Sequence, residues 1–202
     1  MRPDFRFEHS LDGIICGIDE AGRGPLAGPV IAAAVILPVD PPAFLLSDLD
    51  DSKRLSARKR AALFDVIQSC ARTGIGRAEV AEIDRLNILR ATFLAMARAL
   101  ENLGVTVNHA LVDGNQAPPL PCKVHCIVGG DGKSLSIAAA SVIAKVSRDR
   151  EMARLAEIFP AYGWERNAGY GTALHRSMIR QVGLTLHHRR SFAPIADLLE
   201  NL

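Results

Sequence analysis

The feature that most constrains the fold is an apolar run that ends in two adjacent carboxylates. This run covers residues 14–18, and Asp19 and Glu20 follow it directly. A second apolar run, residues 30–37, follows a segment rich in glycine and proline. Both runs are short and rich in β-branched residues, which is typical of buried strands. The pattern predicts a hairpin whose first strand ends at acidic groups.

Further along the chain, aspartates again follow predicted strands. The apolar run 109–112 ends in Asp113, and a predicted strand over 123–128 is followed by Asp131 in a glycine-rich segment. Ligands of α/β sheets bind at strand ends. If the strands that carry Asp19 and Asp113 are neighbours, these aspartates and Glu20 converge on one site. Crowded carboxylates must be protonated or neutralised by cations, and oxygen ligands favour Mg²⁺ or Mn²⁺.

The turn after the first strand has a composition suited to phosphate. Gly22 and Gly24 lack Cβ atoms, so the backbone can approach a ligand and present its N–H groups. Arg23, between them, adds a fork of donors. The segment taken alone leaves an alternative open, in which Asp19 and Glu20 form a solvated turn whose geometry the glycines permit.

The rest of the chain alternates predicted strands and helices. We expect helices from about residue 56, over 86–103 with Gly104 as a left-handed cap, and over 136–159, with a weak strand over 74–80. This order predicts an α/β sheet with helices on its faces. The length of 202 residues and the 49% hydrophobic content fit a single domain over 1–202, with a small helical extension from about residue 160.

Composition excludes several classes of protein. The net charge of +2 does not by itself indicate nucleic-acid binding, and four cysteines do not form a secreted disulfide framework. The longest apolar run is far shorter than the roughly 20 residues that span a bilayer. Cys122 and Cys126 lack a second ligand pair at zinc-finger spacing, so we assign them to a strand. We therefore expect a cytoplasmic protein without membrane contact.

Six blocks, taken together and in order, resemble ribonuclease HII. They extend from about residue 14 to residue 192. The blocks are Asp19-Glu20-Ala21-Gly22-Arg23-Gly24-Pro25, Asp51-Ser52-Lys53, Leu111-Val112-Asp113-Gly114, Gly130-Asp131-Gly132-Lys133-Ser134-Leu135-Ser136, Ala138-Ala139-Ala140-Ser141 and Gly169-Tyr170-Gly171-Thr172. The resemblance implies a ribonuclease H-like fold, with a five-stranded mixed sheet flanked by helices and extra C-terminal helices.

The resemblance also implies an activity. Members of this family are metal-dependent endonucleases that hydrolyse the RNA strand of RNA/DNA hybrids and cut 5′ of ribonucleotides embedded in duplex DNA. The products carry 5′ phosphate and 3′ hydroxyl groups, and the roles are ribonucleotide excision repair and RNA primer removal. Two Mn²⁺ or Mg²⁺ ions are expected, with Asp19, Glu20 and Asp113 as ligands and Asp131 as the fourth acidic residue. We expect a monomer.

Substrate contacts carry over from the same blocks. The backbone of Gly22, Arg23 and Gly24 resembles the family's reader of the 2′-hydroxyl group. Tyr170 resembles the aromatic that packs on the next sugar, although a lone tyrosine in a glycine-rich loop can also be a packing anchor. The expected phosphate or sugar contacts are Ser52, Lys53, Lys133, Arg189 and Arg190.

Other basic and imidazole groups receive a structural interpretation. We expect Arg58, Lys59 and Arg60 to form an exposed helix face, and His175 to pack or bond locally. A lysine often stands where this chain has Ala168, so one phosphate contact is expected to be missing.

Three alternatives compete with this interpretation. Ribonuclease HIII shares the carboxylates, but its N-terminal substrate-binding domain has no room before Asp19. A catalytically silent nucleic-acid-binding module would have a broken acidic set, and all four acids are present. A phosphatase with Asp19 as nucleophile would form a covalent phospho-aspartate.

Overall fold

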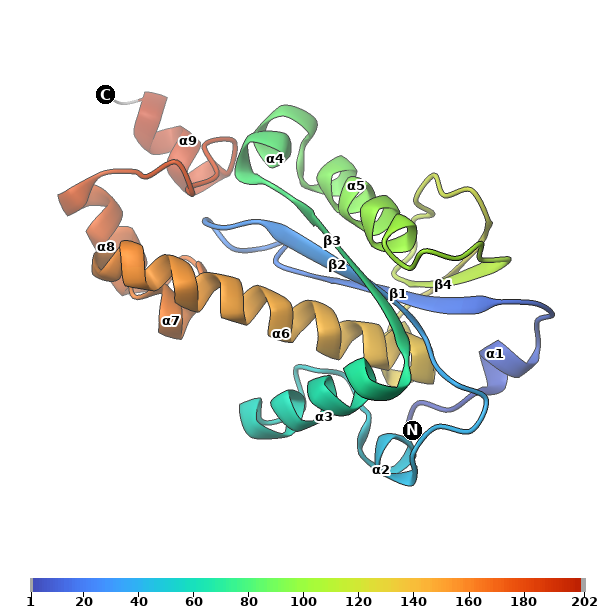
Figure 1. Cartoon of the computed structure of the whole chain (residues 1–202). Coiled ribbons are helices and arrows are strands. Elements are labelled where there is room, and N and C mark those ends of the chain that lie inside the picture. The colour runs from blue at the N-terminus through green and yellow to red at the C-terminus, as the bar shows by residue number, and fades with distance from the viewer. Residues whose placement is uncertain (1, 201–202) are drawn as a thin grey trace.

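The computed structural model describes residues 2–200 as a five-stranded sheet with helices on both faces (Figure 1). The strands are β1 (Ile15–Ala21), β2 (Val30–Ile36), β3 (Arg72–Ala78), β4 (His109–Asp113) and β5 (Lys123–Ile127). Their order in the sheet is β3-β2-β1-β4-β5. The pairs β1–β2 and β2–β3 are antiparallel, whereas β1–β4 and β4–β5 are parallel. The expected mixed five-stranded sheet is confirmed.

Strand β1 is longer than the sequence indicated. Asp19 and Glu20 were expected just beyond the strand, but both lie within it, paired with Ala33 and Ala32 of β2. The hairpin ladder continues after the parallel partner β4 has ended, since the last β1–β4 pair is Ile18 with Val112. Asp19 therefore lies where one neighbour of β1 stops, and the expectation that the strands carrying Asp19 and Asp113 are neighbours is confirmed.

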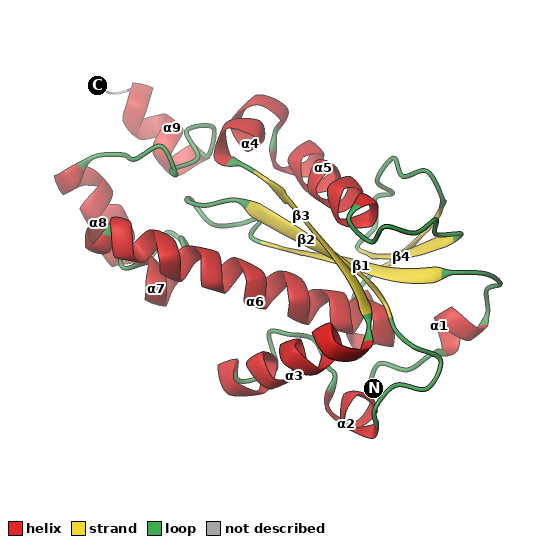
Figure 2. Cartoon of the chain, viewed as in Figure 1, coloured by secondary structure: helices red, strands yellow, loops and turns green. Residues whose placement is uncertain are grey.

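Two long helices cover the opposite faces of the sheet (Figure 2). Helix α5 (Ile88–Glu101) packs on β2 and β3, whereas α6 (Leu135–Ile158) packs on β1 and β2 beside α3 (Ala57–Cys70). Glycine permits close approach on both faces. A Cβ atom at Gly74 or Gly76 would overlap the backbone of α5, and one at Gly17 would overlap the backbone where α6 begins. The helices therefore lie directly against the strands there.

The predicted helix over 86–103 corresponds to α5, and a shorter helix that was not predicted precedes it. Helix α4 (Val80–Leu86) ends at Asn87, whose φ of 69° interrupts the helical path, and the Asn87 side chain then caps α5 by accepting from the N–H of Arg90. The weak strand was instead expected to extend to residue 80, where α4 begins. Helix α3 begins after Ser56, which caps it as expected, and Gly104 has the expected left-handed φ of 67°.

The remaining helices are short and lie mostly at the ends of the molecule. None of the helices within residues 2–200 is both long enough and apolar enough to cross a membrane. Helices α7, α8 and α9 gather beyond one end of α6 and form the expected C-terminal extension (Figure 1). Helices α1 and α2 were not expected. The bounds are α1 (Arg6–His9), α2 (Ala43–Asp48), η1 (Gly130–Gly132), η2 (Pro160–Tyr162), α7 (Trp164–Asn167), α8 (Ala173–Val182) and α9 (Ala193–Glu200).

Candidate active site

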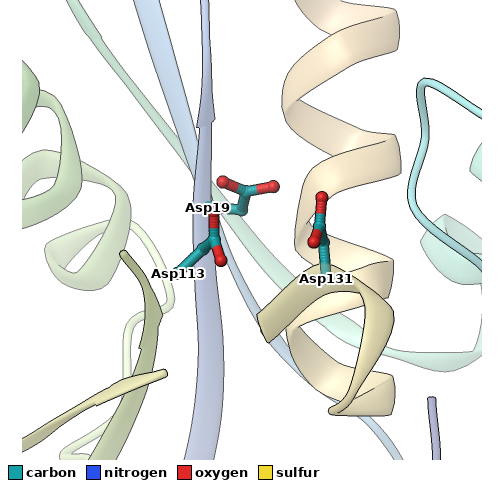
Figure 3. Close-up of side chains that lie close together, drawn as sticks. All are labelled: Asp19, Asp113 and Asp131. Carbon is teal, nitrogen blue, oxygen red and sulfur yellow. The ribbon is translucent and has the colours of Figure 1, made fainter. Parts of the chain in front are cut away.

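Three aspartates from different elements meet at the edge where β4 ends (Figure 3). Asp19 comes from β1, Asp113 is the last residue of β4, and Asp131 lies in the short helix η1. Each offers a carboxylate oxygen, and these oxygens lie within 4.8 Å of one another. In the described part of the chain, this is the one group of three or more potential metal ligands so closely placed.

Backbone hydrogen bonds place these carboxylates. Asp113 Oδ1 accepts from the N–H of Gly130 at 2.6 Å, which joins the end of β4 to η1. Asp19 Oδ1 accepts from the N–H of Glu20 at 2.7 Å. A Cβ atom at Gly130 would lie 2.6 Å from Ile137 Cδ1, so a larger residue there would require the Ile137 side chain to shift. The short helix is therefore held beside β4, and Asp131 faces Asp19 and Asp113.

The electrostatics of the cluster favour a bound cation. Burial, and then the charges of Glu20 and Asp113, raise the pKa of Asp19 well above its ordinary value. Burial is also the main cause that raises the pKa of Asp131, followed by the charge of Asp113. Buried like charges are costly unless neutralised. Clustered oxygen ligands of this kind fit Mg²⁺ or Mn²⁺.

Glu20 lies beside the aspartate group rather than within it. Burial, opposed by Arg23, raises its pKa, and its Oε1 forms an ion pair with Arg23 Nη1 at 3.5 Å. Its Oε2 is buried and has no hydrogen-bond partner among residues 2–200. A buried oxygen of this kind is available to a ligand. Of the four predicted acids, the structure thus brings three into one group and leaves the fourth next to it.

A cleft of about 460 Å³ opens beside the carboxylates. Tyr170 lies on this cleft with half of its surface exposed. Burial lowers the pKa of Lys53, but the charges of Asp51 and then Asp19 outweigh it and raise that pKa. The predicted residues that line the cleft are Asp19, Glu20, Gly22, Arg23, Gly24, Ser52, Lys53 and Tyr170.

Three predicted substrate contacts do not line the cleft. Arg189 is fully buried, and its guanidinium donates to the carbonyls of Gly22, Arg23 and Gly28, so the expected phosphate contact is replaced by a structural one. Lys133 donates to the carbonyl of Val128 at 2.6 Å. Arg190 is exposed, as a phosphate contact requires.

Arg148 was not predicted to be part of the site. Its guanidinium is buried and donates to the carbonyls of Ala27, Pro29 and Ala168 at 2.9–3.0 Å. It thereby joins the loop after β1 to the loop that carries Tyr170, and it reaches the cleft. A signal existed, because Arg148 lies four residues before Met152 and four after Ala144, within an apolar stripe of α6.

The loop that carries Ser52 also differs from expectation. Arg60, predicted to be part of an exposed helix face, donates to the carbonyls of Ser52 and Leu55 and lines the cleft. Lys59 forms an ion pair with Asp48 at 2.9 Å. The helix face is therefore exposed mainly at Arg58, and Arg60 fixes the Ser52 loop against the cleft.

Residues 16–195 match the family model described as Ribonuclease HII. The chain belongs to the ribonuclease HII family. Ribonuclease HII of Paramagnetospirillum magneticum is 61% identical over 198 residues, covering 98% of both chains. The Gluconobacter oxydans ribonuclease HII is 56% identical over 200 residues, covering 98% of this chain and 97% of that protein. The chain is thus a ribonuclease H, a hydrolase that acts as an endonuclease on RNA/DNA substrates.

Solved structures agree with this membership. The ribonuclease H2 of Pyrococcus horikoshii matches with a TM-score of 0.78 and 25% identity, covering 94% of this chain and 98% of that one. The ribonuclease HII of Archaeoglobus fulgidus, solved in complex with PCNA, matches with a TM-score of 0.74 and 28% identity, covering 88% and 94%. A third solved structure, that of Bst-ribonuclease HIII, shares the fold at 19% identity, with 71% of its length covered. Family membership excludes the ribonuclease HIII alternative.

Proposed function

We propose that this ribonuclease HII family member is a metal-dependent endonuclease that cuts hybrid RNA strands and also cuts 5′ of a single ribonucleotide in duplex DNA. The observation that carries the proposal is the group of three aspartates, with Asp19 and Asp131 buried and Asp113 partly buried, beside a cleft that also contains Tyr170. Buried acids without a protein cation among them call for a metal, and the aromatic ring offers a flat surface for a sugar.

The four acids are the groups that would hold metal. Asp19, Asp113 and Asp131 supply clustered oxygens, and Glu20 adds its buried Oε2. Two divalent cations bound there would supply Lewis acidity for the entering and leaving oxygens of a displacement at phosphorus. In that displacement a water oxygen bonds to phosphorus, the bond from phosphorus to the 3′ oxygen breaks, and the 3′ oxygen gains a proton. The products carry 5′ phosphate and 3′ hydroxyl.

The loop after β1 has the properties of a 2′-hydroxyl reader. Arg189, which does not line the cleft, donates to the carbonyls of Gly22 and Arg23, and we propose that the N–H groups of this loop meet the substrate. A Cβ atom at Gly22 would overlap Arg148, so glycine is required for the loop to lie on that guanidinium. A hydroxyl group can accept from such backbone donors, and this distinguishes RNA from DNA.

Tyr170 lies next to this loop. A Cβ atom at Gly24 would contact Tyr170 Cε1 at 3.6 Å, so the ring and the proposed hydroxyl reader are neighbours. A ribose bound at the loop would place the following sugar against the ring, where a deoxyribose packs best. We therefore propose that Tyr170 supplies the preference for a step from ribonucleotide to deoxyribonucleotide.

The decisive experiment is cleavage of a labelled DNA duplex that contains one ribonucleotide. The assay includes Mn²⁺, Mg²⁺ or a chelator, with an all-DNA duplex as control. We expect a cut 5′ of the ribonucleotide that requires metal and leaves 3′ hydroxyl and 5′ phosphate. Cleavage of long hybrids alone would contradict the proposed role of Tyr170. Cleavage that persists in chelator would contradict the proposed metal dependence.

A further inference from the structure

Behind Tyr170 lies a buried network of hydrogen bonds that the proposed chemistry does not use. His175 Nδ1 is 2.9 Å from the carbonyl oxygen of Tyr170. Trp164 Nε1 donates to His175 Nε2 at 3.0 Å, and His188 Nε2 lies 3.1 Å from the same atom. Trp164 and His175 are fully buried, and His188 is 1% exposed. The network therefore operates without solvent.

The donors and acceptors of this network have one consistent arrangement. Thr185 N–H can only donate, so His188 Nδ1 accepts from it at 2.9 Å, and the proton of a neutral His188 is on Nε2. His175 Nε2 then accepts from two donors, the Nε2–H of His188 and the indole N–H of Trp164. His175 must then carry its own proton on Nδ1, where the acceptor is the Tyr170 carbonyl.

This arrangement requires both imidazoles to be neutral, and their surroundings favour that form. Burial lowers the pKa of His175. Burial, followed by the proximity of His175, lowers the pKa of His188 to about 4. The Nδ1–H of His175 is consequently available as a donor at neutral pH.

The main chain of Tyr170 is fixed on both sides of its Cα atom. Its N–H donates to the carbonyl of Asn167 at 2.8 Å, and its carbonyl accepts from Thr172 N–H at 2.8 Å as well as from His175. The ring itself is half exposed over the cleft. Anchoring of the backbone, more than packing of the ring, therefore determines where the ring lies.

We propose that His175 is a positioning residue for sugar recognition, because its Nδ1–H fixes the Tyr170 carbonyl and thereby the ring that packs on the sugar. The proposal rests on the role given to Tyr170 above. A group held in its working position before the substrate binds loses no further freedom on binding. Loss of the donor should therefore weaken the preference for a lone ribonucleotide more than the overall activity.

Two substitutions separate the two halves of the imidazole. In His175→Asn the side-chain amide reaches the place of Nδ1 and can still donate to the Tyr170 carbonyl, but the acceptor for Trp164 is lost. In His175→Gln the terminal amide oxygen reaches the place of Nε2, so the acceptor is kept and the donor to Tyr170 is lost. The pair distinguishes positioning of Tyr170 from stabilisation of the buried network.

The experiment compares kcat/KM for a duplex with one ribonucleotide and for a long hybrid, together with the melting temperature. We expect His175→Gln to lower the ratio of the two kcat/KM values about threefold, and His175→Asn to keep that ratio while melting at a lower temperature. His109→Gln is the matched control, since it likewise removes the Nδ1 half of an imidazole and breaks another hydrogen bond between two histidines, from His109 Nδ1 to His125 Nε2, that does not line the cleft. A normal ratio in His175→Gln, or equal losses on both substrates, overturns the proposal.

Substitution of Tyr170 tells the two proposals apart. If Tyr170→Ala leaves the ratio unchanged, the proposed role of Tyr170 fails, and the role of His175 fails with it. If Tyr170→Ala lowers the ratio but His175→Gln does not, only the role of His175 fails. In the Tyr170→Ala background, His175→Gln should lower the ratio no further, because its effect passes through the ring.

Discussion

Two sets of buried charge lie beside the same cleft, and they are stabilised in different ways. The acidic set, Asp19, Asp113 and Asp131, gathers like charges, and burial raises the pKa of Asp19 and of Asp131. The basic set, Arg148 and Arg189, is buried more deeply, but each of its guanidinium groups donates to three different backbone carbonyls. The acidic set is compensated only in part, by backbone N–H groups and the nearby Lys53, whereas the basic set is compensated by main-chain carbonyl groups.

The difference shows what each set does. Burying a charge is costly unless it is paired or fully hydrogen-bonded. The guanidinium groups meet that condition, so we interpret them as structural supports of the loops that face the substrate. The carboxylates do not meet it, so we interpret them as a site that a metal ion completes. Buried charge therefore indicates function when its compensation must come from outside the protein.

The largest expected effect is on cleavage, when one carboxylate of the acidic set is neutralised. Asp19→Asn should lower cleavage at least about 1,000-fold, roughly 4 kcal/mol in barrier, because a neutral amide is a poor ligand for a divalent cation. In the absence of metal the variant should melt no lower than wild type, since it removes a repelled charge. Mn²⁺ should no longer raise its melting temperature.

The control for this change is Asp40→Asn, at an exposed position away from the cleft, which should leave cleavage and melting unchanged. Retained activity in Asp19→Asn would remove Asp19 from the site.

The next largest effect is on stability, when one guanidinium group of the basic set is removed. Arg148→Met should lower the free energy of unfolding by about 3–5 kcal/mol, because three buried carbonyls lose their donor. Urea denaturation measures this loss. Arg150→Met on the same helix is the matched control, since Arg150 is exposed, and it should cost less than about 1 kcal/mol. Equal losses in the two variants would contradict the structural role of Arg148.

A third test concerns the buried, neutral imidazole of His188. The pKa of His188 falls from 6.5 to about 4 in the folded protein. Below pH 6.5 His188 is protonated in the unfolded chain but stays neutral in the folded chain. Its contribution to the free energy of unfolding is therefore complete above pH 6.5 and declines as the pH falls toward 4. The decline should reach roughly 3 kcal/mol, and His188→Gln should lack it. Denaturation of both proteins between pH 7 and pH 4.5 measures the difference, and parallel curves would contradict the assignment.

A smaller effect concerns the ring over the cleft. Tyr170→Ala should lower kcat/KM about tenfold, or ~1.4 kcal/mol, for a duplex with one ribonucleotide, and less for a long hybrid. Only the former depends on the step between two kinds of sugar. Tyr170→Phe keeps the flat face and should retain most of the preference. Equal losses on both substrates would show that the ring acts only as a packing anchor.

The smallest expected effect separates two adjacent arginines. Arg190 is exposed, so Arg190→Ala should weaken hybrid binding a few-fold and lower the slope of binding against salt by about one phosphate contact. Arg189 is buried, so Arg189→Ala should lower stability instead. Binding measured at several salt concentrations, together with denaturation, assigns each residue. An unchanged salt slope in Arg190→Ala would remove its phosphate contact.

The acidic set was largely predictable from the sequence. Short apolar runs located the strands, and carboxylates after them pointed to one edge of the sheet. Neighbouring parallel strands then placed Asp19 beside Asp113, as the register confirms. The exact end of β1 was not predictable, because the hairpin ladder to β2 continues past the apolar run and includes Asp19 and Glu20.

The basic set was not predictable in the same way. Arg189 and Arg190 look alike in the sequence, but the first bonds carbonyls more than 160 residues away, and the second faces solvent. Which of two adjacent arginines turns inward depends on loops that only the tertiary structure assembles. Helix α4 was not predicted either, since the weak strand was expected to extend to residue 80, where this helix begins.

The contact between β1 and α6 has a consequence for the tolerance of this chain to change. Gly17 lets the strand that carries Asp19 rest on the backbone at Ser136, only five residues after Asp131. No side chain lies between the two backbones at this contact. The distance between the carboxylates of Asp19 and Asp131 therefore depends on how closely the two main chains pack. Core residues elsewhere can vary in compensating pairs, whereas any enlargement at position 17 changes the dimensions of the catalytic centre itself.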